Sequence, residues 1–216
     1  MGKFISFEGP EGAGKTTQIQ QLRSLLRKMG HTCVVTKEPG GTTIGQKIRE
    51  ILLHSDHSEM VPVCEALLYL ADRAQHVQEI IRPNLEEGHW VITDRYHDST
   101  AAYQGAARGL EPETLAGLFQ LATGGLKPDL TFLLDIPVDL GLRRANARNM
   151  ASAQQITEGR FEAETLEFHT RVRNHFLAMA RNEPQRFVVV DATMAPERVA
   201  EEIAMQLKKR WTLAHV

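Results

Sequence analysis

The chain has 216 residues, of which 42% are hydrophobic and 24% are charged, so it is long enough to bury a substantial core within one domain. Its formal net charge of −2 argues against a dedicated DNA- or RNA-binding protein, in which a basic surface normally appears in the charge balance. The N-terminus leads directly into a strand-like segment, and neither a signal peptide nor a membrane span is predicted.

Five short apolar runs, separated by longer amphipathic stretches, predict strands that are buried on both faces. They cover residues 4–7, 32–36, 90–93, 130–134 and 187–190. Strands that alternate with helical patterns form a parallel sheet covered by helices. The sequence therefore predicts an α/β fold.

Helical patterns fill the intervals between these runs. In the first of them Ile19, Leu22 and Leu26 recur at helical spacing, and Gly30 follows as a stop signal. Pro83 is expected to kink or divide a long helix that ends before Gly88. The predicted helices cover residues 16–29, 62–87, 99–107, 112–122, 138–149, 161–180 and 196–213.

One polar, Gln-rich stretch, residues 149–159, has no clear period between two good helical patterns. Loops of this kind inside a compact domain are often functional flaps. We therefore expect a single domain over residues 1–216 with a flexible lid at about 144–160.

A phosphate-binding loop is predicted at residues 9–16, where the sequence GPEGAGKT matches GxxxxGK[ST] between a predicted strand and a predicted helix. In such a loop backbone N–H groups point at phosphate oxygens, Lys15 reaches the β- and γ-phosphates, and Thr16 offers a hydroxyl to Mg²⁺. ATP or GTP is the implied ligand, and the alternative is a Gly-rich turn that carries Lys-Thr by chance. The expected binding residues are Gly9, Pro10, Glu11, Gly12, Ala13, Gly14, Lys15, Thr16 and Thr17.

A second group of polar residues follows the second and third predicted strands, at residues 38–42 and 94–96. Ligands of open α/β sheets bind at the carboxyl ends of the strands. Asp94 is therefore placed to contact Mg²⁺ or its waters, and the guanidinium of Arg95 suits a phosphate. The alternative for these two residues is a surface ion pair.

Six motifs carry a resemblance to a known family: GPEGAGKT at 9–16, EPGGT at 38–42, ADRAQ at 71–75, DRYHDSTAAYQGAARG at 94–109, PDLTFLLD at 128–135 and GRFE at 159–162. Together they resemble the thymidylate kinase family over nearly the whole chain. The resemblance implies the P-loop nucleoside monophosphate kinase fold, with a five-stranded parallel sheet flanked by helices. It also implies ATP with Mg²⁺ as the donor, dTMP as the acceptor and usually a homodimer.

By that resemblance Arg95 and Arg49 hold the acceptor phosphate, and Arg73 hydrogen-bonds the thymine ring. Tyr69 matches the position where the family stacks an aromatic ring on the base. Tyr69 and Arg73 are four residues apart on a predicted helix, so they share a face and can address one flat ligand. The alternative is a core tyrosine beside a solvated arginine.

Further roles on the acceptor side are implied by the resemblance alone. Thr100 and Gln104 match side-chain and water-linked contacts to the base edge, and Tyr103 matches the residue that crowds the sugar C2′ position. Glu11 matches an acidic residue that faces the 3′-hydroxyl. Glu38 is expected to order this region or the metal waters, and the bottom-up interpretation of Ser99 is a helix cap.

Phosphoryl transfer also requires a cation on the migrating group. Some family members carry an arginine where this chain has Ala13, so the cation is expected from a bacterial-type lid that carries Arg144, Arg148 and Arg160. Gly159 and Asn146 depart from the family pattern, which leaves the choice among the three arginines open. The alternative is a solvated basic helix end.

Two rival functions remain open. A kinase of similar architecture could accept dUMP, dCMP or a purine monophosphate, and a P-loop regulatory NTPase would have no acceptor. Cys33 and Cys64 fit no metal-ligand or CxxC spacing, which predicts buried thiols in a reduced cytoplasmic protein. Neither a nucleic-acid nor a membrane partner is expected. The histidines at 54, 57, 76 and 97 are interpreted as ordinary surface groups.

Overall fold

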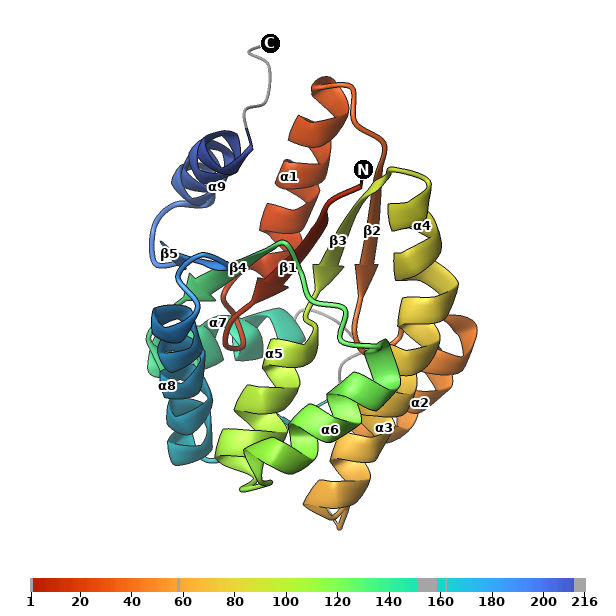
Figure 1. Cartoon of the computed structure of the whole chain (residues 1–216). Coiled ribbons are helices and arrows are strands. Elements are labelled where there is room, and N and C mark those ends of the chain that lie inside the picture. Colours follow the sequence, from red (N-terminus) through yellow and green to blue (C-terminus); the bar gives the residue numbers. More distant parts are fainter. Residues whose placement is uncertain (1, 58, 151–158, 162, 212–216) are drawn as a thin grey trace.

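A five-stranded parallel sheet forms the centre of the computed structural model, which describes residues 2–57, 59–150, 159–161 and 163–211, without the side chains of residues 148–150. The strand order is β2-β3-β1-β4-β5 (Figure 1). All neighbouring strands run parallel. The strands are β1 (Phe4–Glu8), β2 (Cys33–Lys37), β3 (Trp90–Asp94), β4 (Leu130–Asp135) and β5 (Phe187–Asp191).

All five predicted strands are therefore confirmed, but their burial differs between the centre and the edges of the sheet. β1 is buried along its whole length, whereas β2 is mostly half-buried and Val189 of β5 is 48% exposed. An edge strand has a neighbour on one side only, and helices cover it less completely. The prediction that every strand is buried on both faces is wrong for β2 and β5.

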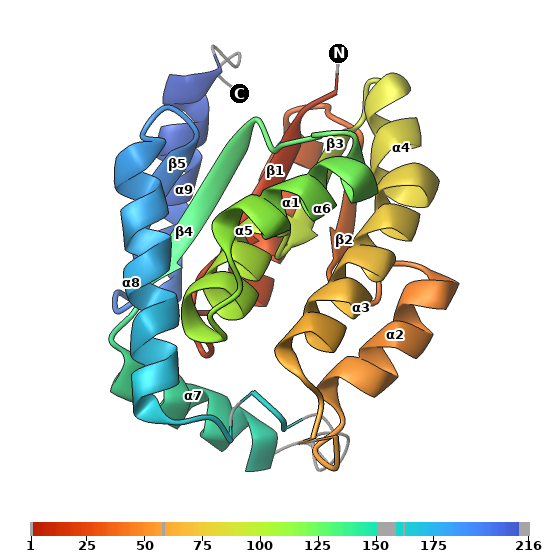
Figure 2. The ribbon, with the colours of Figure 1, turned by 60° about the horizontal axis from the view of Figure 1, so that its bottom comes forward.

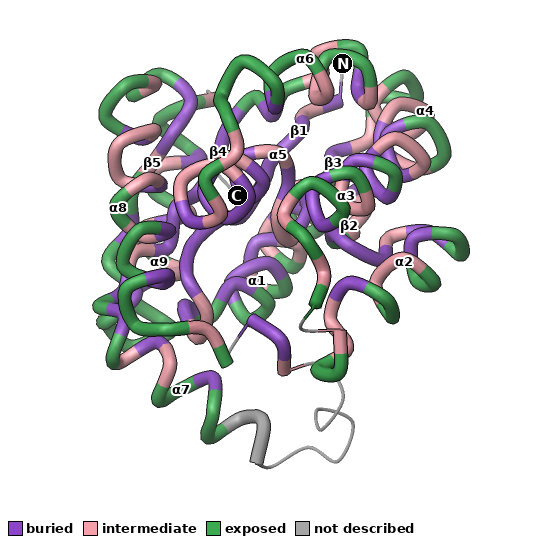
Figure 3. Tube along the Cα trace, turned by 90° about the horizontal axis from the view of Figure 1, so that it is seen from below, coloured by how far each residue is buried: buried purple, intermediate pink, exposed green. Residues whose placement is uncertain are grey.

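Helices cover both faces of this sheet. α1 (Lys15–Lys28) and α9 (Pro196–Arg210) pack on one face, against side chains such as Ile5 and Phe7. α8 (Leu166–Asn182) covers the other face, where Leu133 points. Alternate residues of a strand point to opposite faces, so one strand contributes side chains to the hydrophobic cores on both faces of the sheet. Figure 3 shows the buried strands inside a shell of helices with exposed outer surfaces.

The long helix predicted at 62–87 is divided, as expected from Pro83. It consists of α3 (Pro62–His76), a π-helical turn η1 (Val77–Ile81) and α4 (Arg82–Glu86). Proline lacks an N–H and clashes with the preceding turn, and a π-turn absorbs the interruption without breaking the helix. The segment predicted at 99–107 is likewise split into α5 (His97–Thr100) and the π-helix η2 (Ala101–Ala107).

The remaining helices include one that the sequence analysis missed, α2 (Thr43–Leu53), which Thr42 caps by accepting a hydrogen bond from the Gly45 N–H at 2.9 Å. α8 begins at Leu166 rather than at residue 161, because the Thr165 hydroxyl caps it there. α6 (Pro112–Thr123) and α7 (Val138–Met150) agree with prediction. In Figure 2, α8 and the pair α2–α3 lie on opposite sides of α5 and α6.

Three further predictions concern the cysteines, the polar flap and membrane spans. Cys33 is buried but Cys64 is exposed, so the prediction of two buried thiols is wrong for Cys64, which lies in the first turn of α3. Most of the expected flap, residues 151–158, lies outside the described residues. None of the described helices is both long and apolar enough to cross a membrane.

Candidate active site

One cavity of about 860 Å³ opens at the carboxyl ends of the central strands. Much of its lining comes from three segments that are far apart in the sequence: the phosphate-binding loop, residues 35–41 at the end of β2 and beyond it, and several residues between 94 and 104 at the end of β3 and beyond it. The predicted site residues on its wall are Glu11, Gly12, Ala13, Gly14, Lys15, Thr16, Thr17, Glu38, Arg49, Tyr69, Arg73, Asp94, Arg95, Thr100, Tyr103, Gln104 and Arg144. The chain thus brings both predicted halves of the site into one space.

The loop between β1 and α1 has the conformation expected of a phosphate-binding loop. Gly12 has φ 70°, and a Cβ at this position would collide with the carbonyl of Gly141. Lys15 folds back over the loop, where its Nζ donates to the carbonyl oxygens of Gly9 (3.1 Å) and Pro10 (3.2 Å). Burial, with Arg95 nearby, lowers the pKa of Lys15 to about 8. The ammonium group of Lys15 is therefore held against the loop that opens α1.

The two predicted metal ligands lie together at the mouth of the loop. Thr16 Oγ1 donates to Asp94 Oδ2 at 3.3 Å. Mg²⁺ prefers oxygen ligands and usually binds through one or two protein groups together with substrate phosphates. Among the described residues no group of three acidic, histidine or cysteine side chains forms a complete metal cage. A hydroxyl and a carboxylate beside a phosphate loop fit Mg²⁺ that is delivered with a nucleotide.

Arg95 joins the two halves of the cavity. Its Nη1 donates to the Gly9 carbonyl oxygen (3.2 Å), and its Nη2 donates to Glu11 Oε1 (3.1 Å) and to the Tyr103 hydroxyl (3.1 Å). The residue has φ 68°, which is strained for a side chain with a Cβ. Burial alone would raise the pKa of Glu11, but His169 and Arg95 together hold it well below its usual range. The guanidinium is thus fixed over the phosphate-binding loop.

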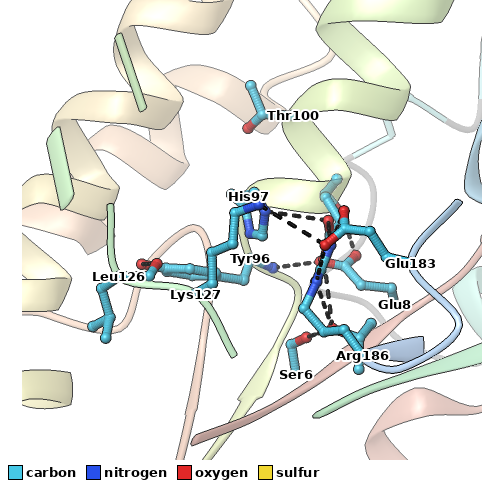
Figure 4. Close-up of polar contacts among 12 residues, drawn as sticks. Ser6, Glu8, Tyr96, His97, Thr100, Leu126, Lys127, Glu183 and Arg186 are labelled. Atoms are coloured by element: carbon cyan, nitrogen blue, oxygen red, sulfur yellow. Dashed lines mark hydrogen bonds and ion pairs between the residues drawn. The ribbon is translucent and has the colours of Figure 1, made fainter. Parts of the chain in front are cut away.

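A buried carboxyl group at the end of β1 holds the loop that carries Arg95. Glu8 accepts hydrogen bonds from the Tyr96 N–H (2.8 Å) and from the Ser99 hydroxyl (2.6 Å) (Figure 4). Ser99 also accepts from Arg95 Nη1 at 3.1 Å. It lies inside α5, whose N-cap is Tyr96, so the interpretation of Ser99 as a helix cap is wrong. Burial, reinforced by the nearby Asp98, raises the pKa of Glu8 to about 8.

The same loop is fixed from the opposite edge of the sheet. Arg186, just before β5, forms a two-pronged pair with Asp98, at 2.6 and 2.8 Å. The Tyr96 hydroxyl donates to the Leu126 carbonyl oxygen at 3.0 Å (Figure 4). The side chain of His97 is only 13% exposed, and its partial burial lowers its pKa to about 4, so the interpretation of His97 as an ordinary surface group is wrong.

Arg73 lies in the wall of the cavity and is 1% exposed. Its Nε donates to Glu38 Oε2 (2.7 Å), while its Nη1 and Nη2 donate to Thr100 Oγ1 (2.9 Å) and to the Tyr96 carbonyl oxygen (3.1 Å). The other oxygen of Glu38 lies 2.8 Å from Nδ1 of His76, which is fully buried. The expectation that His76 is a surface group is therefore wrong. Glu38 orders this part of the site through Arg73.

The remaining acceptor-side residues cluster around Arg73. Tyr69 and Arg49 line the cavity, and Arg49 Nη1 donates to the Pro39 carbonyl oxygen at 3.1 Å. Gln104 Nε2 donates at 2.7 Å to Glu65, a fully buried residue of α3. The residues expected to contact a base therefore lie on α3, at the end of α5 and on η2.

Two of the three predicted lid arginines, Arg144 and Arg160, make contacts in different parts of the structure. Arg144 lines the cavity and donates to the Ala192 carbonyl oxygen at 2.9 Å. Arg160 is 8% exposed and pairs with Glu65 at 2.6 Å, and it is not among the residues that line the cavity. The side chain of Arg148 lies outside the described residues.

Three further residues belong to this site although the sequence analysis did not single them out. They are Glu8, Glu65 and His169, whose Nδ1 lies 3.2 Å from Glu11 Oε2. Each is fully buried, and each contacts partners that are distant in the sequence. A buried ionisable residue inside an apolar pattern is the only signal that marks Glu8 and Glu65 beforehand.

Comparisons with known proteins agree on one family. The family model described as thymidylate kinase matches residues 7–203. A thymidylate kinase of Geobacter sulfurreducens is 52% identical over 210 residues, which cover 97% of this chain and 98% of the relative. Those of Desulfosudis oleivorans (95% of this chain, 96% of the relative) and Nitratidesulfovibrio vulgaris strain Miyazaki F (93% of each) are both 51% identical.

Proposed function

The chain belongs to the thymidylate kinase family, and on that premise we propose that it transfers the terminal phosphoryl group of ATP to dTMP, giving dTDP and ADP. The observation that carries the proposal is the contact of Arg95 with the Gly9 carbonyl oxygen at 3.2 Å. A cation suited to the acceptor phosphate thereby lies against the loop suited to the donor. Two phosphate groups bound at these points would meet end to end.

On the donor side the backbone amides of residues 9–16 bind the ATP phosphates. Lys15, now bonded to two loop carbonyls, turns its three N–H donors to the β- and γ-phosphates. Binding of an anion there restores the full charge of Lys15, since opposite charge raises a lysine pKa. Thr16 and Asp94 would hold Mg²⁺, which, when bound, neutralises charge on the phosphates.

On the acceptor side Arg95 and Arg49 bind the dTMP phosphate, and Arg73, Thr100 and Gln104 face the base. Tyr69 stacks on the ring, and its partial exposure within the cavity wall leaves a face for such contact. Glu11 accepts from the 3′-hydroxyl, while Tyr103 occupies the space near C2′. The network that already immobilises Arg73 and Arg95 lets them bind without losing further side-chain freedom.

The transfer step needs little acid or base chemistry. An oxygen of the dTMP phosphate attacks the γ-phosphorus in line, and the bond to the β-γ bridging oxygen of ATP breaks to release ADP. The attacking oxygen is already anionic, so no general base is required. Positive charge from Lys15 and from a lid arginine stabilises the migrating group. Of the lid arginines, we favour Arg148 for that role, with Arg144 at the cavity wall.

We also propose that the protein acts as a cytoplasmic homodimer, because both substrates are soluble metabolites and α3 exposes apolar side chains. Val63 and Leu67, four residues apart on that helix, are 55% and 49% exposed. Sedimentation equilibrium should give twice the monomer mass. A monomer at micromolar concentration would contradict this part of the proposal.

Coupled detection of ADP tests the function directly. At a fixed concentration of ATP with Mg²⁺, dTMP should give the highest kcat/KM in a panel with dUMP, dCMP, dAMP and dGMP. Slow ATP hydrolysis that no monophosphate changes would identify a regulatory NTPase instead. Preference for another monophosphate would identify a kinase of different specificity.

A further inference from the structure

Glu65 lies outside the cavity, at the point where α3, η2 and the segment before α8 meet, and it is fully buried. Its Oε2 lies 2.6 Å from Arg160 Nη1 and 3.3 Å from Arg108 Nη2. Its Oε1 accepts the amide N–H of Gln104 at 2.7 Å. A carboxylate that faces two guanidinium groups accepts hydrogen bonds and donates none.

This contact fixes which end of the Gln104 amide faces the cavity. A glutamine amide has one donor end and one acceptor end, and Glu65 can bind only the donor end. Gln104 is 1% exposed and forms part of the cavity wall. Within the described part of the chain no donor reaches its Oε1. The acceptor end of Gln104 is thus the one available to a ligand.

The neighbouring hydroxyl has the opposite polarity. Thr100 Oγ1 already accepts from Arg73 Nη1 at 2.9 Å, so its own hydrogen is available for donation. Thr100 precedes Gln104 by four residues, and both line the cavity. The wall therefore offers a donor beside an acceptor. Thymine and uracil present the complementary pair, the O4 acceptor beside the N3–H donor, whereas cytosine presents an N4 amine beside an N3 acceptor.

We propose that Glu65 is a positioning residue that determines base specificity: by holding the donor end of Gln104 it makes the cavity favour pyrimidines with an N3–H and disfavour cytosine. The inference rests on the proposed function, because it assumes that the base of the acceptor lies against Gln104. It assigns to Glu65 a role in discrimination between acceptors and none in the transfer step.

Glu65→Gln tests this assignment with dTMP, dUMP and dCMP. The new amide would keep its oxygen toward Arg160 and turn its N–H₂ toward Gln104, which would then present its own N–H₂ to the base. We expect kcat/KM for dTMP and for dUMP to fall together by about tenfold or more, as for a mispaired buried polar group. The value for dCMP should stay constant or rise.

Glu164→Gln is the matched control. Glu164 pairs with Arg108 at 2.6 Å but has no contact with Gln104, so the ratio between dTMP and dCMP should not change. The double variant Glu65→Gln/Arg108→Gln removes one charge of each sign and the Arg108 N–H that faces Oε1 at 3.3 Å. It keeps the test valid if the single variant folds poorly.

The outcomes separate the two proposals. A fall of equal size for all three acceptors would show that Glu65 has only a structural role and would overturn the inference. An unchanged ratio between dTMP and dCMP in both Glu65 variants would overturn it as well. A wild-type protein that phosphorylates none of the pyrimidine acceptors would refute the proposed function itself.

Discussion

The donor and acceptor halves of the cavity are built on different principles. The donor half is one continuous loop, residues 9–16, of which residues 11–16 line the cavity, and loops of this kind bind phosphate mostly through backbone N–H groups. The acceptor half is assembled from side chains on several elements, and buried carboxyl groups hold them: Glu8 holds the Arg95 loop, Glu38 holds Arg73 and Glu65 holds Gln104. A short sequence motif is enough to recognise a phosphate group. Recognition of a particular nucleotide requires side chains that are held in place by residues distant in the sequence.

The largest effect should come from the donor half, where one side chain acts almost alone. Lys15→Ala should lower kcat by about 10²–10³-fold or more, since it removes the ammonium group that we propose contacts the β- and γ-phosphates. Circular dichroism and Tm should remain close to wild type. Lys28→Ala, on the exposed end of the same helix, is the control and should retain activity. Normal turnover by Lys15→Ala would refute the phosphate-binding role of the loop.

In the acceptor half, removal of a positive charge should change KM for dTMP more than kcat. Arg95→Ala should raise KM for dTMP by about 100-fold, because charge-assisted hydrogen bonds to the phosphate are lost. KM for ATP should change much less. Arg95→Lys should restore part of the loss, since an ammonium keeps the charge without the fork. Unaltered saturation by dTMP in Arg95→Ala would exclude Arg95 from phosphate binding.

Removal of a lid arginine should destabilise the transition state and leave the binding of both substrates nearly unchanged. Arg148→Ala should lower kcat at least about tenfold with little change in KM for dTMP, since its contact forms mainly during transfer. Steady-state kinetics would check this. Arg160→Ala should instead lower Tm, because it leaves Glu65 without its partner at 2.6 Å. An unchanged kcat in Arg148→Ala would assign the catalytic cation elsewhere.

The last effect concerns stability and leaves turnover aside, and it comes from the buried carboxyl of Glu8. Its pKa in the folded protein, about 8, is above the usual 4.5, so the folded state binds the proton more tightly than the unfolded state. Stability is therefore lost as pH rises from about 4.5 to 8, by about 1 kcal/mol per pH unit. Glu8→Gln should remove this pH dependence of stability, while the oxygen of the new amide still accepts the hydrogen bond from the Tyr96 N–H.

The measurement is Tm or urea unfolding of both proteins between pH 5 and 8, and Glu87→Gln, at an exposed site, is the control. Wild type and Glu8→Gln should diverge steadily over this range, because only the wild type carries a group that ionises within it. Parallel curves would mean that Glu8 is already ionised at pH 5.

The same contrast explains how far the sequence could predict this structure. The strands and the phosphate-binding loop follow from short contiguous patterns, and both agree with expectation. The helix α2 was missed because it follows the EPGGT motif directly and its cap, Thr42, was assigned to that motif. The start of α8 was placed too early because Phe161 continues its apolar pattern across a turn.

The site itself divides in the same way. Motif residues such as Arg73 and Tyr103 do line the cavity, as expected from their resemblance to a known family. Contacts that join α8 to the loop, such as His169 with Glu11, depend on tertiary packing that no local pattern records. The interpretations of His76 and His97 failed for this reason, since a histidine's burial is set by elements far away in the chain.

The pairing of β1 with β3 has a consequence for how this protein tolerates change. Phe7 pairs with Asp94 in register, and the Arg95 N–H donates to the Phe7 carbonyl oxygen at 2.9 Å. The spacing between neighbouring strands, about 4.8 Å, therefore helps to set how far Arg95 lies from the loop that follows β1. Inserting or deleting one residue in β3 would turn its side chains to the opposite face. Evolutionary drift in length is therefore best accommodated at the outer strands and in surface loops.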